Sequence, residues 1–313
     1  MSFLRFFKLS TALILFCTVT GSEAAKLEIA ILPAADSLIL ETACAQGFFK
    51  ERNLEVKLVP FKSALEVGAA FRAGRISGQF GDLMNVIVQN ETGVLQKVVA
   101  VTTQTEKKQR RFALVTSPSK AAAIMSTDDL KNTSTAMSSN TIIEYLLDGM
   151  RNELKLAEDA LSFKEIKQIP VRLQLLLTGK VDTALLPEPL VTLAVSKGSR
   201  VLWDDRRLNE TLAVISLKDG ILDRKETDEF IAALNEAASF IKDNKDASLK
   251  LMLKKRLLPK EIATVYEMID LCDEKGQLPP LPSKDEFSRV ASWMLQHGMI
   301  KKQPRYEDLI LTK

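Results

Sequence analysis

A pattern that occurs twice along the chain, 105 residues apart, constrains the fold more than any other sequence feature. Gly74 and Gly179 each end a helical stretch and are followed by a basic residue, a short β-rich run, a polar turn and a second helical stretch. Gly93 and Gly198 end those second stretches, so two pairs of glycines share one offset. Because a fixed offset indicates a structural duplication, we expect two similar lobes, each a small α/β unit.

Short β-rich runs alternate with longer helical stretches in the first half of the chain, which is typical of a parallel sheet with helices on both faces. Helices are expected at 37–49, where Asp36 and Ser37 form an N-cap pair, and at 63–72, where Ser63 and Glu66 have capping-box spacing. The expected strands are 26–32, 54–61, 76–82, 97–103 and 111–117.

The last 90 or so residues are expected to be mostly helical. The helical stretches are 225–246, 247–257, 259–269 and 283–299, with a short proline-rich loop before the last of them. Such a tail after two α/β lobes is expected to return and cover one of them.

The first residues have the pattern of a secretory signal peptide. Arg5 and Lys8 precede the apolar run 9–19, and small residues then predict cleavage after Ala24. The run is about eleven residues, whereas crossing a hydrocarbon core needs about 20. Lipid attachment at Cys17 is the less favoured alternative, because a bulky phenylalanine precedes it. We therefore expect an exported, periplasmic protein.

No later segment predicts a membrane span, and the best candidate, 171–179, carries Arg172. The 43 basic and 40 acidic residues are interspersed, so nothing indicates a nucleic-acid partner. Of the cysteines outside the signal peptide, Cys44 and Cys272 could pair in an oxidising compartment, but two separately buried thiols are the preferred alternative.

Most enzyme classes are disfavoured by what the sequence lacks. His297 is the only histidine, so a multi-histidine metal site is excluded, and its place beside a glycine is typical of a helix end. The chain has no P-loop, no Gly-x-Gly-x-x-Gly turn and no Cys-x-x-Cys. We expect no catalytic residues, no metal and no cofactor, with a carboxylate-dependent enzyme as the remaining alternative.

Polar residues gather after the predicted strands, where ligands bind in open α/β sheets. The offset of 105 places the turn of Asp82 opposite that of Glu188, so the two turns face each other if the lobes do. Helix capping is the alternative role for several of these residues. The expected ligand-binding residues are Asp36, Ser37, Asp82, Leu83, Ser138, Ser139, Asn140, Thr141 and Glu188.

The charges of these clusters predict a ligand class. Asp36, Asp82 and Glu188 have no basic neighbour within the clusters, which favours a small nitrogenous, aminopyrimidine-like ligand that donates hydrogen bonds. A sulfonate or nitrate-like oxyanion at the helix start 138–141 is the alternative, because free N–H groups there favour negative charge. The enzyme alternative would use Asp82 and Glu188 as acid and base.

Several segments, in their order and spacing, resemble the soluble substrate-binding proteins of ABC importers. These segments are 47–61, 73–83, 176–190, 196–202, 293–300 and 305–310. The most similar group contains the nitrate, sulfonate, taurine and thiamine-precursor (NMT1/THI5-like) binding proteins.

The resemblance implies an α/β fold of the type 2 periplasmic-binding-protein kind, in which two lobes joined by two crossings close on a ligand. It places the crossings near 110–117 and 210–218, which makes 25–113 with 216–313 lobe 1 and 114–215 lobe 2. It also implies a small-molecule ligand and an ABC permease in the inner membrane as partners. We expect the protein to be a monomer.

Overall fold

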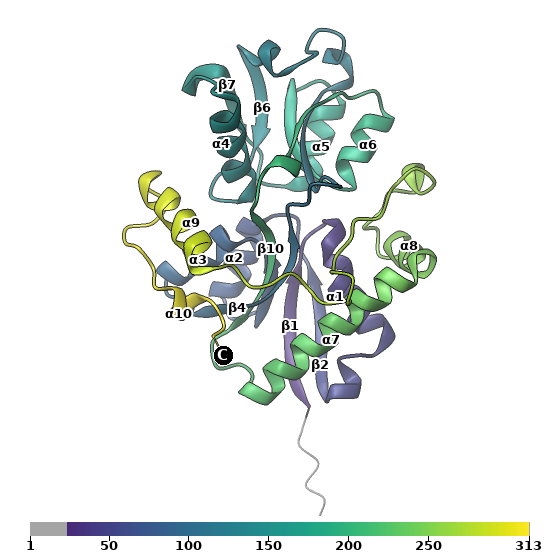
Figure 1. Ribbon diagram of the computed structural model, residues 1–313, viewed down its shortest axis with the longest axis vertical. Coiled ribbons are helices and arrows are strands. Elements are labelled where there is room, and N and C mark those ends of the chain that lie inside the picture. The colour runs from purple at the N-terminus through teal and green to yellow at the C-terminus, as the bar shows by residue number, and fades with distance from the viewer. Residues whose placement is uncertain (1–23, 313) are drawn as a thin grey trace, which may run out of the picture.

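The computed structural model describes residues 24–312, so the predicted signal peptide and Cys17 lie outside the described residues. Two lobes stand one above the other, each built around a five-stranded sheet (Figure 1). The lobe 1 sheet has the order β2 (Leu54–Pro60), β1 (Ala25–Ile31), β3 (Gly78–Gly81), β10 (Thr211–Lys218) and β4 (Gln96–Gln104). The lobe 2 sheet has the order β7 (Leu161–Glu165), β6 (Thr133–Met137), β8 (Thr183–Pro187), β5 (Phe112–Thr116) and β9 (Val201–Asp204).

The two sheets confirm the predicted duplication. The offset of 105 carries the first residue of β3 onto that of β8, and the first residue of β4 onto that of β9. The anchor glycines adopt the left-handed conformation at both ends of the offset, with φ of 66° at Gly74 and 69° at Gly179, and of 91° at Gly93 and 97° at Gly198. Side chains other than glycine rarely adopt this conformation, which explains why these positions mark the repeat so clearly in the sequence.

In each sheet the fourth strand is the one that directly follows a segment crossing from one lobe to the other. β5 follows the outward crossing and pairs antiparallel with β8 and β9, while β10 follows the return and pairs antiparallel with β3 and β4. The crossings therefore occupy residues 105–111 and 205–210. The boundaries expected at 113/114 and 215/216 fall inside β5 and β10. The whole of β5 belongs to the lobe 2 sheet, and the whole of β10 belongs to the lobe 1 sheet.

Ten α-helices flank the sheets in the described chain. Lobe 1 carries α1 (Leu38–Gln46), α2 (Ala64–Arg72), α3 (Leu83–Glu91), α7 (Arg224–Asp243), α8 (Lys245–Lys254), α9 (Lys284–Gln296) and α10 (Tyr306–Leu309), and lobe 2 carries α4 (Ile142–Leu154), α5 (Ile169–Leu177) and α6 (Leu190–Ser196). Short 3₁₀ helices lie at Ala35–Ser37, Lys50–Arg52, Pro118–Lys120, Thr127–Leu130, Glu158–Ala160, Asp205–Arg207 and Lys260–Ile262. Within residues 24–312 no helix is both long and apolar enough for a membrane crossing.

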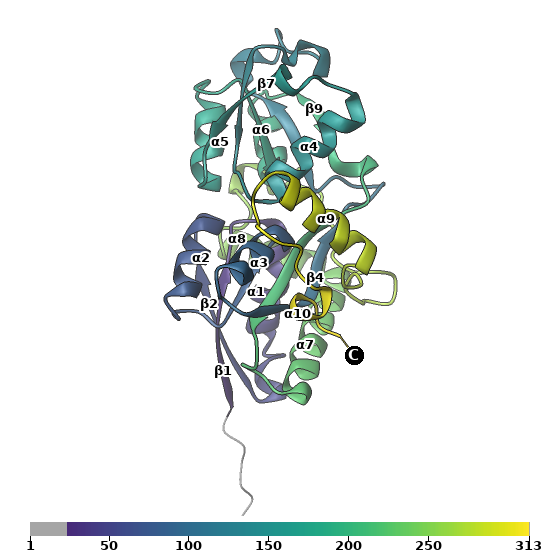
Figure 2. The same cartoon turned by 90° about the vertical axis from the view of Figure 1, so that its left-hand side faces the viewer.

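The C-terminal tail covers lobe 1, as expected. α7 packs with α1 over one face of the sheet, where the Phe49 and Phe230 rings stack with centroids 5.1 Å apart. α9 packs with α3 and reaches lobe 2, where the Trp293 indole donates to Asp148 of α4 at 2.9 Å (Figure 2).

The segment 259–269 is not the predicted helix, apart from the single 3₁₀ turn Lys260–Ile262. The backbone at its end and just after it bonds instead to the outward crossing. Gln109 Nε2 donates to the carbonyl of Met268, and Gln109 Oε1 accepts from the N–H of Asp270. The two cysteines of the described chain, Cys44 and Cys272, are unpaired, which agrees with the preferred alternative.

Helix starts follow the sequence in part. Ser63 caps α2 by accepting from the N–H of Glu66, as predicted, although the Glu66 carboxylate accepts from the N–H of Lys62 rather than from that of Ser63. Asp36 and Ser37 do not cap α1 with their side chains. The Ser37 hydroxyl donates to the carbonyl of Ala34 instead, at 2.8 Å.

Candidate functional site

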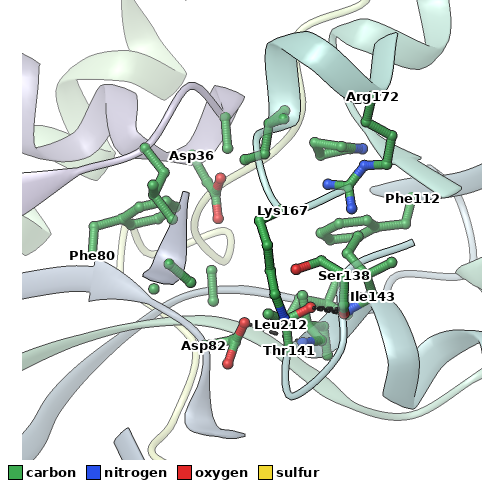
Figure 3. A pocket seen from close by; sticks show the side chains of 18 residues that line it. Asp36, Phe80, Asp82, Phe112, Ser138, Thr141, Ile143, Lys167, Arg172 and Leu212 are labelled. Atoms are coloured by element: carbon green, nitrogen blue, oxygen red, sulfur yellow. Dashed lines mark hydrogen bonds between the residues drawn. The ribbon is translucent and has the colours of Figure 1, made fainter. Parts of the chain in front are cut away.

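A cavity of about 80 Å³ lies between the two lobes and is lined by both (Figure 3). Its lining includes residues at the start of the two strands that follow the crossings, Phe112 of β5 and Leu212 of β10. Apolar side chains dominate its wall. The lining residues are Leu32, Ala34, Asp36, Ala64, Phe80, Gly81, Asp82, Phe112, Ser138, Thr141, Ile142, Ile143, Lys167, Ile169, Arg172, Pro187, Leu212 and Ala213.

Arg172 of α5 is the most unusual group in this wall. Its side chain is 1% exposed, and its Nε and Nη1 atoms have no hydrogen-bond partner. It makes no ion pair with any residue of the described chain. Burial lowers its pKa to about 10, so it stays charged at neutral pH. The Glu165 carboxylate acts on this guanidinium from beyond ion-pair distance, so the cost of burying the charge is only partly offset within the chain.

Asp36 lies on the lobe 1 side of the same cavity and is 7% exposed. Its Oδ2 accepts hydrogen bonds from the hydroxyls of Thr102 at 3.1 Å and Thr103 at 2.6 Å, both in β4. Desolvation raises its pKa, and the two hydroxyls together with the Arg111 guanidinium only partly oppose that effect. The Asp36 side chain therefore faces the cavity rather than capping α1.

Asp82 links the lobes. It caps α3, because Oδ1 accepts from the N–H of Asn85 at 2.8 Å, and its Oδ2 accepts from the N–H of Ile142 in α4 of lobe 2 at 3.1 Å. Burial raises its pKa against these bonds. The N-terminus of α4 thus already holds a carboxylate, while Thr141 caps it through the N–H of Ile143. The oxyanion position expected at 138–141 is occupied by the protein itself.

Glu188 does not line this cavity. It borders a separate surface pocket beside Arg110, whose Nε donates to its Oε1 at 2.7 Å, and its Oε2 accepts from the N–H and hydroxyl of Thr192. The predicted clusters contain no basic side chain, but the fold brings one to Glu188 from outside them. Arg110 is 78 residues from Glu188 in the chain, so only the fold brings them together.

The structure divides the other predicted site residues. Ser138 and Thr141 line the cavity with Asp36 and Asp82. Ser37, Leu83, Ser139, Asn140 and Glu188 do not, since Ser37 and Leu83 are buried elsewhere and the other three bond outside the cavity. Lys167 adds a second cation, but its Nζ pairs with Glu165 at 2.6 Å and bonds the Ser139 hydroxyl at 2.8 Å.

Sequence reasoning missed Arg172, Phe112 and Ile169 as lining residues. Arg172 was visible only as the charge within the apolar stretch 171–179, where it counted against a membrane span. Long arginine side chains in such stretches usually reach water, so the sequence does not separate that case from burial.

Hydrogen bonds hold the lobes together at the rim. The N–H of Ile169 donates to the carbonyl of Lys62 at 3.1 Å, and Gln168 Nε2 donates to Glu66 Oε1 at 2.7 Å. Both join lobe 2 residues at the start of α5 to lobe 1 residues at the start of α2. The described chain offers no group of three His, Cys, Asp or Glu side chains that could hold a metal ion.

Residues 35–248 match the family model described as NMT1/THI5 like. No curated protein matches the sequence. Among solved structures, the chain is similar to the alkanesulfonate-binding protein SsuA from Xanthomonas axonopodis pv. citri bound to MOPS, with 16% identity over 93% of this chain and 99% of that one, and a TM-score of 0.75.

Two further structures resemble the chain to a similar degree. The ligand-binding component of an ABC-type import system from Staphylococcus aureus with zinc bound is 16% identical over 91% of this chain and 96% of that one, with a TM-score of 0.73. The periplasmic nitrate-binding protein NrtA from Synechocystis PCC 6803 is 12% identical over 89% of this chain and 83% of that one, with a TM-score of 0.71. These likenesses confirm the type 2 periplasmic-binding-protein fold.

Proposed function

The chain belongs to the NMT1/THI5-like family, and on that premise we propose that it is the solute-binding component of an ABC importer. It would capture a small solute between its lobes in the periplasm and deliver it to a permease in the inner membrane, without a catalytic step. The proposal is supported by the cavity between the lobes and by the names of the similar structures, which include an ABC import component and sulfonate- and nitrate-binding proteins.

The observation that carries the proposal is the buried Arg172 guanidinium in the cavity wall. Two of its nitrogens have no partner and it makes no ion pair, so a ligand that supplies an anionic group would offset the cost of burying this charge. Arginine also presents several N–H donors in a fixed fork, which suits a carboxylate, sulfonate or phosphate. We infer that the solute carries an anionic group that contacts Arg172.

This inference changes the weight of the two ligand classes drawn from the sequence. The nitrogenous ligand was argued from three carboxylates, but Asp82 and Glu188 have partners within the chain. Asp36 likewise has partners within the chain, because Thr102 and Thr103 donate to it and the Arg111 guanidinium acts on it electrostatically. The oxyanion class gains support from Arg172 instead of from the start of α4. The apolar wall of the cavity favours an anion that also carries a short hydrocarbon part.

Calorimetry and thermal shift on the mature protein test the proposal. A panel of small carboxylates, sulfonates and inorganic anions is titrated into protein that has been unfolded and refolded to remove bound ligand. A ligand that binds only the folded state raises the melting temperature. At a ligand concentration of about 100 times its Kd, it adds about 2.7 kcal/mol to the free energy of unfolding. Binding that is lost in Arg172→Gln and kept in Arg200→Gln, which removes an exposed arginine of the same lobe, supports the proposal. Binding of cationic solutes alone would contradict it.

Closure of the lobes gives a second test. Small-angle scattering should show a smaller radius of gyration with ligand than without it, because ligand contacts from both lobes favour the closed arrangement. Identical curves at saturating ligand would count against a clamp.

The enzyme alternative loses the pair of groups on which it rested. Asp82 lines the cavity between the lobes, whereas Glu188 borders a different pocket and is neutralised by Arg110. A proton donor and acceptor for one substrate must lie within hydrogen-bond reach of it, which this arrangement does not provide. Recovery of the bound compound unchanged after long incubation is the expected result.

A further inference from the structure

Helix α9 belongs to lobe 1 but also contacts lobe 2, away from the two segments that cross between the lobes. In Figure 1 and in Figure 2 it lies next to α4, and it packs on α3. One apolar cluster runs from these lobe 1 helices into lobe 2, and it includes Val86 of α3, Met294 of α9 and Leu146 of α4. Besides the crossings 105–111 and 205–210, α9 therefore adds a non-covalent connection between the lobes.

Trp293 of α9 makes the most specific part of this connection. Its indole Nε1 donates to Asp148 Oδ2 at 2.9 Å, and its ring meets the Tyr145 ring in a T-shaped arrangement with centroids 4.9 Å apart. Both partners belong to α4. A hydrogen bond of this length weakens once its two atoms are about 1 Å further apart, so the contact is sensitive to small movements of α4 away from α9.

A second tie joins the same two helices through the return crossing. Glu210 Oε2 accepts from Arg289 Nη2 of α9 at 2.8 Å and from the Tyr145 hydroxyl of α4 at 3.1 Å. One carboxylate at the end of the crossing thus holds a residue of each lobe. Tyr145 takes part in both ties, because its ring packs on Trp293 while its hydroxyl bonds Glu210.

Helix α4 links this contact to the cavity. Ile142 and Ile143 at its start line the cavity, whereas Tyr145 and Asp148, within the next two turns, contact α9. The two groups of residues move together because they lie on one helix. Rotation of lobe 2 about the crossings must move α4 relative to α9, since α9 packs on lobe 1.

Resting on the proposed function, we propose that Trp293 is a positioning residue, which holds the lobes in their closed arrangement through Asp148 and Tyr145. It lies outside the cavity, so it acts on the solute through α4. A solute that binds the closed arrangement has an affinity in proportion to the fraction of the protein that is closed. Weakening the contact of Trp293 therefore weakens binding without any change in the groups that touch the solute.

The chain offers a matched pair of variants for this test. It has two tryptophans, and each donates its indole N–H to a carboxylate of α4 at 2.9 Å. Trp293 bonds Asp148 between the lobes, whereas Trp203 bonds Glu153 within lobe 2. Trp293→Phe keeps an aromatic ring beside Tyr145 and removes the bond between the lobes. Trp203→Phe removes an equivalent bond that lies within one lobe.

Two measurements on refolded protein follow the effect. Isothermal calorimetry gives the affinity for ethanesulfonate, a short alkyl anion, and small-angle scattering gives the radius of gyration without ligand. Trp293→Phe should bind about 3- to 10-fold more weakly than wild type, as expected for one partly exposed hydrogen bond, and should have a larger radius of gyration. Trp203→Phe should match wild type in both. Adding Asp148→Ala to Trp293→Phe should weaken binding no further, because the two residues act through one bond.

Each variant also leaves a single tryptophan as a fluorescent reporter. In Trp203→Phe, acrylamide should quench Trp293 less once ethanesulfonate is added, because closure brings α4 against its ring. In Trp293→Phe, the quenching of Trp203, which is 7% exposed within lobe 2, should stay the same.

The outcomes separate this inference from the proposed function. A Trp293→Phe protein that unfolds more easily but binds and scatters like wild type would overturn the role of Trp293 and leave a solute-binding protein. Failure of ethanesulfonate and of every other anion tested to bind wild type would overturn the proposed function instead. Scattering of ligand-free Trp293→Phe still decides the role of Trp293 in that case, since a larger radius of gyration supports it and an unchanged one overturns it.

Discussion

Replacement of Arg172 by methionine should make the unliganded protein more stable and the ligand complex weaker. Methionine has a similar unbranched shape and no charge, so it can fill the same space in the apolar wall. In the wild type the guanidinium is 1% exposed with two unpartnered nitrogens, and each unsatisfied buried polar group costs about 1 to 3 kcal/mol. Exchanges of buried ions for hydrophobic residues gain about 1 to 4 kcal/mol elsewhere. We expect a gain of about 2 to 4 kcal/mol in the free energy of unfolding.

The cost to binding follows from the same geometry. An anion that accepts from two nitrogens of Arg172 makes two charge-assisted hydrogen bonds of about 1.5 to 3 kcal/mol each. Their loss should weaken anion binding by about 10² to 10⁴-fold. Stability and affinity thus move in opposite directions, which a residue with a purely structural role would not produce.

Urea unfolding of refolded, ligand-free protein measures the first effect, and calorimetry with an anionic probe measures the second. Arg151→Met is the control within lobe 2. Its Nη1 pairs with Asp148 at 3.4 Å, although its Nε is buried without a partner, and it lies outside the cavity, so Arg151→Met should leave affinity unchanged whatever its effect on stability. An Arg172→Met protein that is less stable than wild type and binds anions equally well would refute the reasoning.

Three further predictions follow from other buried groups. Asp82→Ala should lower the free energy of unfolding by about 1 kcal/mol, because the cap of α3 is lost. It should also enlarge the radius of gyration of the ligand-free protein, because the bond to Ile142 across the lobes is lost. Unchanged urea denaturation and scattering curves would contradict this. Burial raises the pKa of Asp205 to about 6, above its ordinary value, so its protonation stabilises the fold as pH falls. Wild type should gain up to about 3 kcal/mol more than Asp205→Asn between pH 7 and pH 4 in urea unfolding, and parallel pH profiles would be the contrary result. Burial raises the pKa of Cys44 to about 11, so iodoacetamide should modify it more slowly than Cys272, as followed by peptide mass; equal rates, or a disulfide between them, would refute this.

The sequence alone determined the duplicated architecture and much of its local structure. The glycines of the repeat could be identified because a positive φ excludes most other residues, so a backbone requirement leaves a direct mark on residue type. The capping of α2 by Ser63 was also predictable, because a capping side chain bonds to a backbone N–H only a few residues away in the sequence. Strands and helices could be predicted from the periodicity of apolar residues wherever local sequence determines the secondary structure.

The tertiary structure decided which of the predicted groups act together. Asp36 meets Thr103 across 67 residues, Asp82 meets Ile142 across 60, and Glu188 meets Arg110 across 78, so none of these partners could be assigned from local spacing. The fold also decided that β5 and β10 complete the sheets of the lobes they enter, which moved both crossings. Arg172 is the clearest case. Its sequence neighbourhood fits either a side chain that reaches water or one buried in a cavity wall, and only the tertiary structure shows that it is buried there.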